Sequence, residues 1–211
     1  MIIIDDIVQQ SPEWYSLRAG VPSASNFKKI ITTKGEPSKS QKDYIYELVG
    51  ERIIGTKEET YQSFDMLKGV EREAEARLFY ELVSGESVRQ VAFVFKDEKR
   101  NVGCSPDSFI AGNVELVMNR PVCGLEIMCP KLKTHTRHLI DKELPYEKFQ
   151  QVQGSMWVCG FHTWMFLSYY PGMPPFILEV QRDYKFTSAL EVEMESFLQE
   201  LDEVYNKLKG V

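Results

Sequence analysis

Two acidic residues in apolar surroundings are the first candidates for chemistry in this chain. Asp107 follows Ser105-Pro106, and Glu126 stands nineteen positions later between Leu125 and Ile127. Carboxylate oxygens are hard ligands that suit Mg²⁺ or Mn²⁺ better than zinc. An unpaired carboxylate in an apolar strand costs on the order of several kcal/mol, which favours a metal site over the alternative of a solvated residue at a sheet edge.

The strand around Glu126 brings a further side chain to the same place. Successive side chains of a strand point to opposite faces, so Glu126 and Met128 share one face while Leu125 and Ile127 pack behind them. If this strand pairs with the segment that holds Asp107, the two carboxylates converge. Position 128 therefore borders the expected metal site.

Positive charge is concentrated in one segment shortly after Glu126. The segment contains Lys131, Lys133, His135, Arg137, His138 and Lys142. The net charge of the whole chain is -6, which argues against a protein that coats nucleic acid through many phosphate contacts. Any contact with DNA must come from a local patch such as this one. The alternative is an ordinary solvated face.

The hydropathy pattern indicates a mixed α/β fold around these residues. Helices are expected near 12–18, 23–31, 44–54, 64–82 and 146–158, and strands near 91–95, 102–104, 114–117, 124–128, 163–169 and 176–181. In the fourth helix, Ala74, Leu78 and Leu82 recur every four residues. A last helix with an apolar stripe from Met194 to Leu208 is expected to form an outer layer on the sheet.

The composition supports one domain over residues 1–211. Of the 211 residues, 43% are hydrophobic and 27% are charged, and no low-complexity tract divides the chain. No run of about 18 apolar residues is present and the acidic start lacks a secretory signal, so a cytoplasmic protein without a membrane partner is expected. Four isolated cysteines and only three histidines offer no zinc set, and we expect reduced cysteines that pack in the core.

Taken together, these residues resemble the lambda-exonuclease and YqaJ-type viral recombinases, phage alkaline exonucleases of the PD-(D/E)xK nuclease superfamily. The resemblance covers most of the chain, and the order and spacing of its motifs are specific although each motif alone is common. The motifs are Trp14 with Leu17-Arg18, Ser23-Ala24-Ser25, Gly69 with Glu73 and Ala76-Arg77, Cys104-Ser105-Pro106-Asp107, Gly124-Leu125-Glu126 with Cys129-Pro130, the segment from Gln151 to Val158, and Tyr169. The implied fold is a restriction-endonuclease-like core with a central mixed sheet flanked by helices.

The resemblance implies a site for Mg²⁺, or Mn²⁺ as a substitute, with two ions. Asp107 and Glu126 would bind the metal, with the carbonyl of Ile127 as a further ligand and Glu73 completing the site from its helix. Gln151 matches an active-site glutamine. From the residues alone, Glu73 is one more exposed charge and Gln151 is an ordinary polar residue of a helix.

The same resemblance assigns residues to DNA binding. Arg18 matches an arginine that holds the terminal 5′-phosphate, and Ser25 matches a serine near the same phosphate. A guanidinium suits this role because it forms two parallel hydrogen bonds with a phosphate and stays charged. Trp14 is either a stacking platform or a core residue, and Lys131 begins the basic segment that would meet the DNA backbone.

One residue departs from the family pattern. Where the pattern has Glu-x-Lys, this chain has Glu126-Ile127-Met128. Methionine has nearly the reach of lysine but no charge, so metal and DNA binding could survive. Loss of a group that orients or activates water typically costs about 10²–10⁴ in rate, so impaired catalysis is expected. Lys131 is a conceivable substitute for the missing lysine, but it lies beyond Pro130 and an odd number of residues from position 128, which corresponds to the opposite face of the strand. Met128 is either a natural departure or an inactivating substitution.

The function implied by the resemblance is Mg²⁺-dependent 5′-to-3′ degradation of one strand of linear duplex DNA, which leaves a 3′ single strand for recombination. Family members form ring-shaped trimers and pair with a single-strand annealing protein, so a homotrimer in the host cytoplasm is expected. One alternative is a module that binds DNA ends or a partner without turnover, which Met128 favours. Another is a restriction-type endonuclease, which would cut closed circles.

Overall fold

The computed structural model describes residues 1–57, 64–111 and 123–210. The first part contains β1 (Ile2–Ile4), α1 (Pro12–Leu17), the 3₁₀ helix η1 (Ala24–Lys29), α2 (Gln41–Ile54) and α3 (Phe64–Ser84). The strands that follow are β2 (Ser87–Arg89), β3 (Phe93–Phe95), β4 (Gly103–Cys104), β5 (Ser108–Ala111) and β6 (Cys123–Met128). The last part contains α4 (Leu132–Asp141), the 3₁₀ helix η2 (Tyr146–Lys148), α5 (Phe149–Cys159), β7 (Thr163–Ser168), β8 (Phe176–Gln181) and α6 (Tyr184–Lys209).

The main sheet is mixed and has the strand order β2-β5-β6-β7-β8. Its neighbours are antiparallel except for β6 and β7, which are parallel. A parallel pair needs a crossover connection, and the segment from α4 to α5 provides it. A smaller sheet contains β1, β3 and β4. This architecture confirms the mixed α/β fold class with a central sheet.

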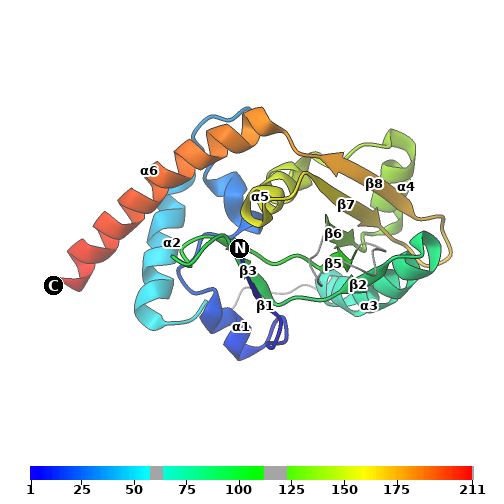
Figure 1. Cartoon of the computed structure of the whole chain (residues 1–211), viewed down its shortest axis with the longest axis horizontal. Helices are drawn as coiled ribbons and strands as arrows, with labels where there is room; N and C mark the ends of the chain where they lie inside the picture. Colours follow the sequence, from blue (N-terminus) through cyan, green and yellow to red (C-terminus); the bar gives the residue numbers. More distant parts are fainter. Residues whose placement is uncertain (58–63, 112–122, 211) are drawn as a thin grey trace.

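Helices cover the main sheet on both faces. On one face of β6, Leu125 and Ile127 pack in a cluster with Ala76 and Tyr80 of α3. On the other face, α5 packs against β6 and β7. Figure 1 shows α3 and α4 beside the sheet at one end of the molecule, α2 and α6 side by side at the other end, and α5 between them. The strand that carries Glu126 is therefore covered from both sides.

Two expectations about helices were wrong. The apolar stripe of α3 was expected at Ala74, Leu78 and Leu82, but Leu78 is 68% exposed and Leu82 is 81% exposed. The face toward β6 carries Ala76 and Tyr80, because a small side chain and a flat ring fit closely over the strand. Helix α6 was expected on the sheet, but its apolar stripe packs on α2 and α5.

Two further segments differ from the expected pattern. The basic segment after Pro130 forms α4, a helix that the charge pattern did not indicate. The strand expected at 114–117 lies outside the described residues. The remaining expected strands and helices are present with ends shifted by a few residues, including β6, β7 and β8. The sequence therefore predicted the elements that position Glu126 but not the helix that follows them.

The cysteines are free, as expected, and three of the four are buried. Cys104 and Cys159 lie in the core with their sulfur atoms 3.6 Å apart. None of the helices in the described ranges combines the length and apolar character that crossing a membrane requires.

Candidate active site

The pairing of β5 with β6 brings the two predicted metal ligands together. Asp107 directly precedes β5, and Ser108 pairs with Leu125, the neighbour of Glu126. The backbone amide of Ile127 donates a hydrogen bond to Asp107 Oδ2 at 2.6 Å. Glu126 is 3% exposed and lies on the face of β6 opposite to Leu125 and Ile127. The two carboxylates are near enough to repel one another.

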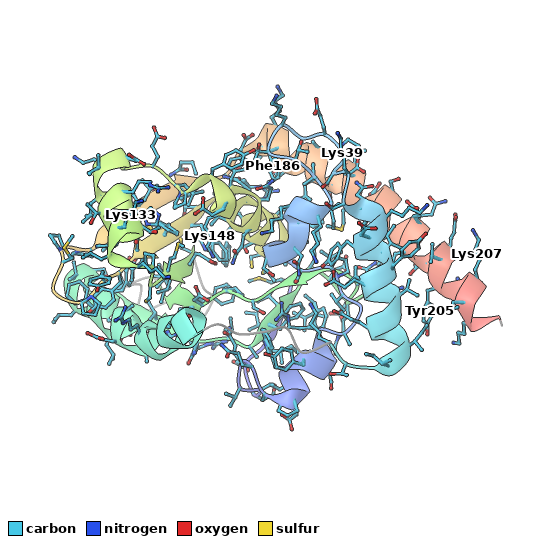
Figure 2. The ribbon with its side chains drawn as sticks, turned by 180° about the vertical axis from the view of Figure 1, so that it is seen from behind. Lys39, Lys133, Lys148, Phe186, Tyr205 and Lys207 are labelled. Atoms are coloured by element: carbon cyan, nitrogen blue, oxygen red, sulfur yellow. The ribbon has the colours of Figure 1, made fainter. Side chains whose placement is uncertain are left out.

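The Glu126 carboxylate is held by two side chains from the crossover. Its Oε1 accepts hydrogen bonds from Lys148 Nζ at 2.7 Å and from Gln151 Nε2 at 2.6 Å. Lys148 Nζ also donates to Gln151 Oε1 at 3.1 Å, so the three polar groups form a triangle. Lys148 is the last residue of η2, and Gln151 lies in the first turn of α5. In Figure 2, Lys148 lies nearer the middle of the molecule than Lys133 on α4.

Lys148 and Arg77 are site residues whose roles the sequence did not indicate. Arg77 Nη2 donates to the backbone carbonyl of Asp107 at 3.3 Å and so fixes the chain before β5. A weak signal existed for each residue. Lys148 precedes Gln151 by one helical turn, and Arg77 follows Glu73 by one turn, so each pair occupies one face.

Burial and neighbouring carboxylates raise the pKa values of Asp107 and Glu73. Burial, together with the nearby charges of Glu126 and Glu73, raises the pKa of Asp107 well above its usual value. Burial also raises the pKa of Glu73; Arg77 opposes this shift and Glu126 adds to it. Burial alone would lower the pKa of Lys148, but the carboxylates of Glu126, Asp107 and Glu73 together outweigh this effect and raise that pKa. The site is thus rich in negative charge that water does not fully offset.

The donor chemistry fits a hard divalent cation. Asp107 and Glu126 supply carboxylate oxygens, and a cation would favour their ionised forms and so reverse the rise in the pKa of Asp107. In the described ranges, no group of three or more His, Cys, Asp or Glu side chains is arranged to hold a metal ion by itself. Coordination by Glu73 and by the carbonyl of Ile127 stays a prediction.

A pocket of about 210 Å³ joins the carboxylate region to the residues expected to bind a terminal phosphate. Its lining includes six predicted site residues, which are Trp14, Arg18, Ser25, Glu73, Asp107 and Gln151. The buried hydroxyl of Ser105 faces the same pocket and has no hydrogen-bond partner among the described residues. A larger pocket of about 510 Å³ lies elsewhere and contains none of the predicted metal ligands. The chemistry of its lining, rather than its size, marks the smaller pocket as the candidate site.

Arg18 carries a buried positive charge into this pocket. Its side chain is 7% exposed, and its guanidinium lies 3.7 Å from the centre of the Trp14 ring. Its Nη2 donates to Ser23 Oγ at 3.3 Å, and Ser23 Oγ is 3.4 Å from Ser25 Oγ. Burial lowers the pKa of Arg18 to about 10, so the group is still charged near neutral pH. Its buried Nε has no partner within the described part of the chain, which leaves a donor for an anion.

Trp14 packs into the protein. Its indole Nε1 donates to the backbone carbonyl of Ala92 at 2.8 Å, and the residue is 8% exposed. One face of the ring is covered by Arg18. Of the two alternatives for Trp14, this geometry favours a core residue that supports Arg18.

The basic segment forms α4, and its side chains do not make one surface patch. Lys131 and Lys133 are exposed, whereas His135 and His138 are buried. Nδ1 of each histidine lies 2.9 Å from Ser168 Oγ at the end of β7. The two histidines therefore fix α4 to the sheet, and only the lysines and Arg137 face solvent, where DNA could contact them.

A comparison with known families covers the segment that carries the site. A family model described as YqaJ-like viral recombinase domain matches residues 13–162. The chain belongs to this family. The match spans every predicted site residue, from Trp14 to Gln151. A search of curated proteins found no match.

Solved structures share the fold of this YqaJ-like chain. The alkaline exonuclease from Laribacter hongkongensis is 28% identical, with a TM-score of 0.80, over 94% of this chain and 96% of that one. The same values hold for that enzyme in complex with dAMP. A phage-related exonuclease from Haemophilus somnus 129PT is 14% identical, with a TM-score of 0.65, over 89% of this chain and 96% of that one, and supports the fold alone.

Proposed function

We propose that this protein is a Mg²⁺-dependent exonuclease that degrades one strand of linear duplex DNA from its 5′ end and leaves a 3′ single strand for recombination. The observation that carries the proposal is the pocket in which Arg18 lies together with Asp107, beside Glu126. The similarity to an alkaline exonuclease, and to its complex with dAMP, supports a reaction that releases mononucleotides.

The predicted site residues have distinct parts in this reaction. Asp107 and Glu126 would hold the metal, with Glu73 and the carbonyl of Ile127 as further ligands. When bound, the cation lowers the pKa of a coordinated water and offsets charge on the scissile phosphate. Gln151 fixes the orientation of Glu126 through its hydrogen bond.

Arg18 and Ser25 set the register of the cut. The Arg18 guanidinium binds the terminal 5′-phosphate, because it is charged, buried and has an unused donor. Hydrolysis one nucleotide further on leaves a new 5′-phosphate, which re-enters the same place. We further propose that the protein acts as a homotrimer and with a single-strand annealing protein.

A second candidate is a module that binds DNA ends without turnover. Met128 favours it, since the side chain beside Glu126 on β6 has no charge and no proton to transfer. The two candidates share the binding of 5′-phosphorylated ends and differ only in cleavage.

A cleavage assay distinguishes the candidates. Linear duplex DNA with 5′-phosphate ends and a label on each strand is incubated with the protein and Mg²⁺, and closed circular DNA serves as the control substrate. We expect loss of nucleotides from 5′ ends, intact circles, and no reaction with Asp107→Ala. Binding without any cleavage, in Mg²⁺ or Mn²⁺ and also with Met128→Lys, would support the second candidate, and cut circles would indicate an endonuclease.

A further inference from the structure

Two positions approach the Glu126 carboxylate from different elements. Met128 lies two residues along β6 and shares the strand face of Glu126. Lys148 reaches the same carboxylate from η2, with Nζ 2.7 Å from Oε1. Its side chain is 21% exposed, so most of it lies inside the protein. A lysine at position 128 would approach the Glu126 carboxylate. Position 128 carries a methionine, but the ammonium group of Lys148 lies beside the same carboxylate.

The position of Lys148 is fixed by the fold. Lys148 ends η2, and α5 begins at the next residue, so Lys148 and Gln151 lie one turn apart on one face. Both donate to Glu126, and Lys148 also donates to Gln151. Lys131, in contrast, is exposed at the start of α4 beyond Pro130. Lys148 is the lysine whose hydrogen bond to the Glu126 carboxylate the structure describes.

We propose that Lys148 is a catalytic residue that supplies from η2 the ammonium that Met128 does not supply from β6, so that the chain as it stands cleaves DNA. This inference rests on the proposed exonuclease function. The protein is therefore expected to retain activity, whereas Met128 considered by itself predicted impaired catalysis.

The ammonium acts without changing its own protonation state. The water oxygen forms a bond to the phosphorus of the second nucleotide, and the bond from that phosphorus to the 3′ oxygen of the first nucleotide breaks. A proton from the water passes to solvent and the 3′ oxygen takes one up, which gives a free nucleotide with a 3′ hydroxyl. Lys148 donates hydrogen bonds to the attacking water or to a phosphate oxygen, and so offsets the charge that develops there.

A purely structural role predicts a different result. If Lys148 only neutralised Glu126 in the metal-free protein, a bound metal would replace it and its removal would not slow the loaded enzyme. If it only held the site together, its removal would weaken metal binding and cleavage together. In the proposed role, removal slows cleavage but leaves Ca²⁺ binding equal or tighter, because an ammonium beside Glu126 repels a cation.

The experiment compares Lys148→Met, Met128→Lys, the double variant Met128→Lys/Lys148→Met, and Lys207→Met as a control at an exposed position of α6. Cleavage of linear 5′-phosphorylated duplex and Ca²⁺ affinity by calorimetry are measured for each. We expect Lys148→Met to lose about 10²–10⁴ in cleavage rate, the double variant to recover most of it, and Lys207→Met to match the original chain. Lys148→Gln provides the same test if Lys148→Met does not fold.

Several outcomes would overturn the inference while the proposed function stands. These are full activity in Lys148→Met, an inactive original chain that Met128→Lys activates, and a parallel loss of Ca²⁺ binding and cleavage that Met128→Lys does not rescue. If neither the original chain nor Met128→Lys cleaves DNA in Mg²⁺ or Mn²⁺, the proposed function fails together with the inference.

Discussion

At the residue scale, the pocket and the strand beside it hold charged groups whose burial costs free energy in the metal-free and DNA-free protein. Arg18 is 7% exposed and Glu126 is 3% exposed. Within the described part of the chain, Glu126 has a charged partner at hydrogen-bond distance, which is Lys148, and Arg18 has none. In the proposed function, a bound phosphate offsets the free-energy cost of burying Arg18, and a bound cation offsets that of burying an ionised Asp107. Both predictions at this scale follow from that uncompensated charge.

Replacing Arg18 should remove the preference for phosphorylated ends. Arg18→Ala loses hydrogen bonds to a charged group worth about 1.5–3 kcal/mol, which is about 10- to 100-fold in affinity for a 5′-phosphorylated end. Binding of the unphosphorylated end should change little. Lys28→Ala, at an exposed position of η1, is the control. Fluorescence anisotropy with both DNA ends measures the effect, and an equal loss for the two ends would contradict the assignment.

Replacing Asp107 with its neutral isostere should stabilise the metal-free protein at high pH. The pKa of Asp107 is raised in the folded state, so its contribution to stability is fully present below the unfolded value of about 3.9 and is lost as the pH rises through the folded value. An asparagine side chain does not ionise, so Asp107→Asn loses no stability at this position as the pH rises. In EDTA, the melting temperature of Asp107→Asn should therefore exceed that of the original chain, by more at pH 8 than at pH 5.

Added Mn²⁺ should remove or reverse this difference, because the ionised carboxylate then has a cation beside it. Equal melting temperatures for the two proteins at every pH in EDTA would contradict a raised pKa at Asp107.

At the element scale, α5 connects the two halves of the pocket. It carries Gln151 toward Glu126, and it packs against η1, which carries Ser25. Close approach of the two helices depends on Gly154, since a Cβ atom there would lie 2.3 Å from the Phe27 ring. A shift between α5 and η1 would move the phosphate-binding residues relative to the carboxylates.

The glycine at 154 should therefore tolerate no side chain. Gly154→Ala is expected to destabilise the protein by about 1–3 kcal/mol through overpacking against Phe27. Gly50→Ala is the matched control, because beyond the backbone of α2 and the two chain neighbours no atom of the described residues lies within 4 Å of an added Cβ, and it should stabilise by about 0.5–1 kcal/mol. Urea unfolding measures both free energies. Two variants of equal stability would show that the α5–η1 contact is not tight.

The sequence predicted the elements of the site better than their contacts. The alternation around Glu126 and the apolar residues beside it predicted β6 and its buried face. The Lys148 contact was not predicted, because Lys148 is 22 residues from Glu126 and a helix lies between them. The buried face of α3 was wrong because exposed Leu78 and Leu82 have the same spacing as core residues, and only the position of β6 selects Ala76 and Tyr80.

At the scale of the whole molecule, a net charge of -6 limits how firmly the chain can hold DNA by phosphate contacts. A closed ring would retain the duplex by enclosure instead. We expect light scattering to give three chain masses in solution, and degradation to continue on bound DNA after excess competitor DNA is added. A monomer at assay concentration that still degrades processively would contradict the ring.

The central claim is that Asp107 and Glu126 hold a divalent cation. Its most direct test is anomalous diffraction from crystals grown with Mn²⁺, with Asp107→Ala crystals as the control. We expect an anomalous peak bounded by the carboxylates of Asp107 and Glu126 in the original chain and none in the variant. Absence of a peak between these two side chains, with Mn²⁺ present and both carboxylates ordered, would contradict the account.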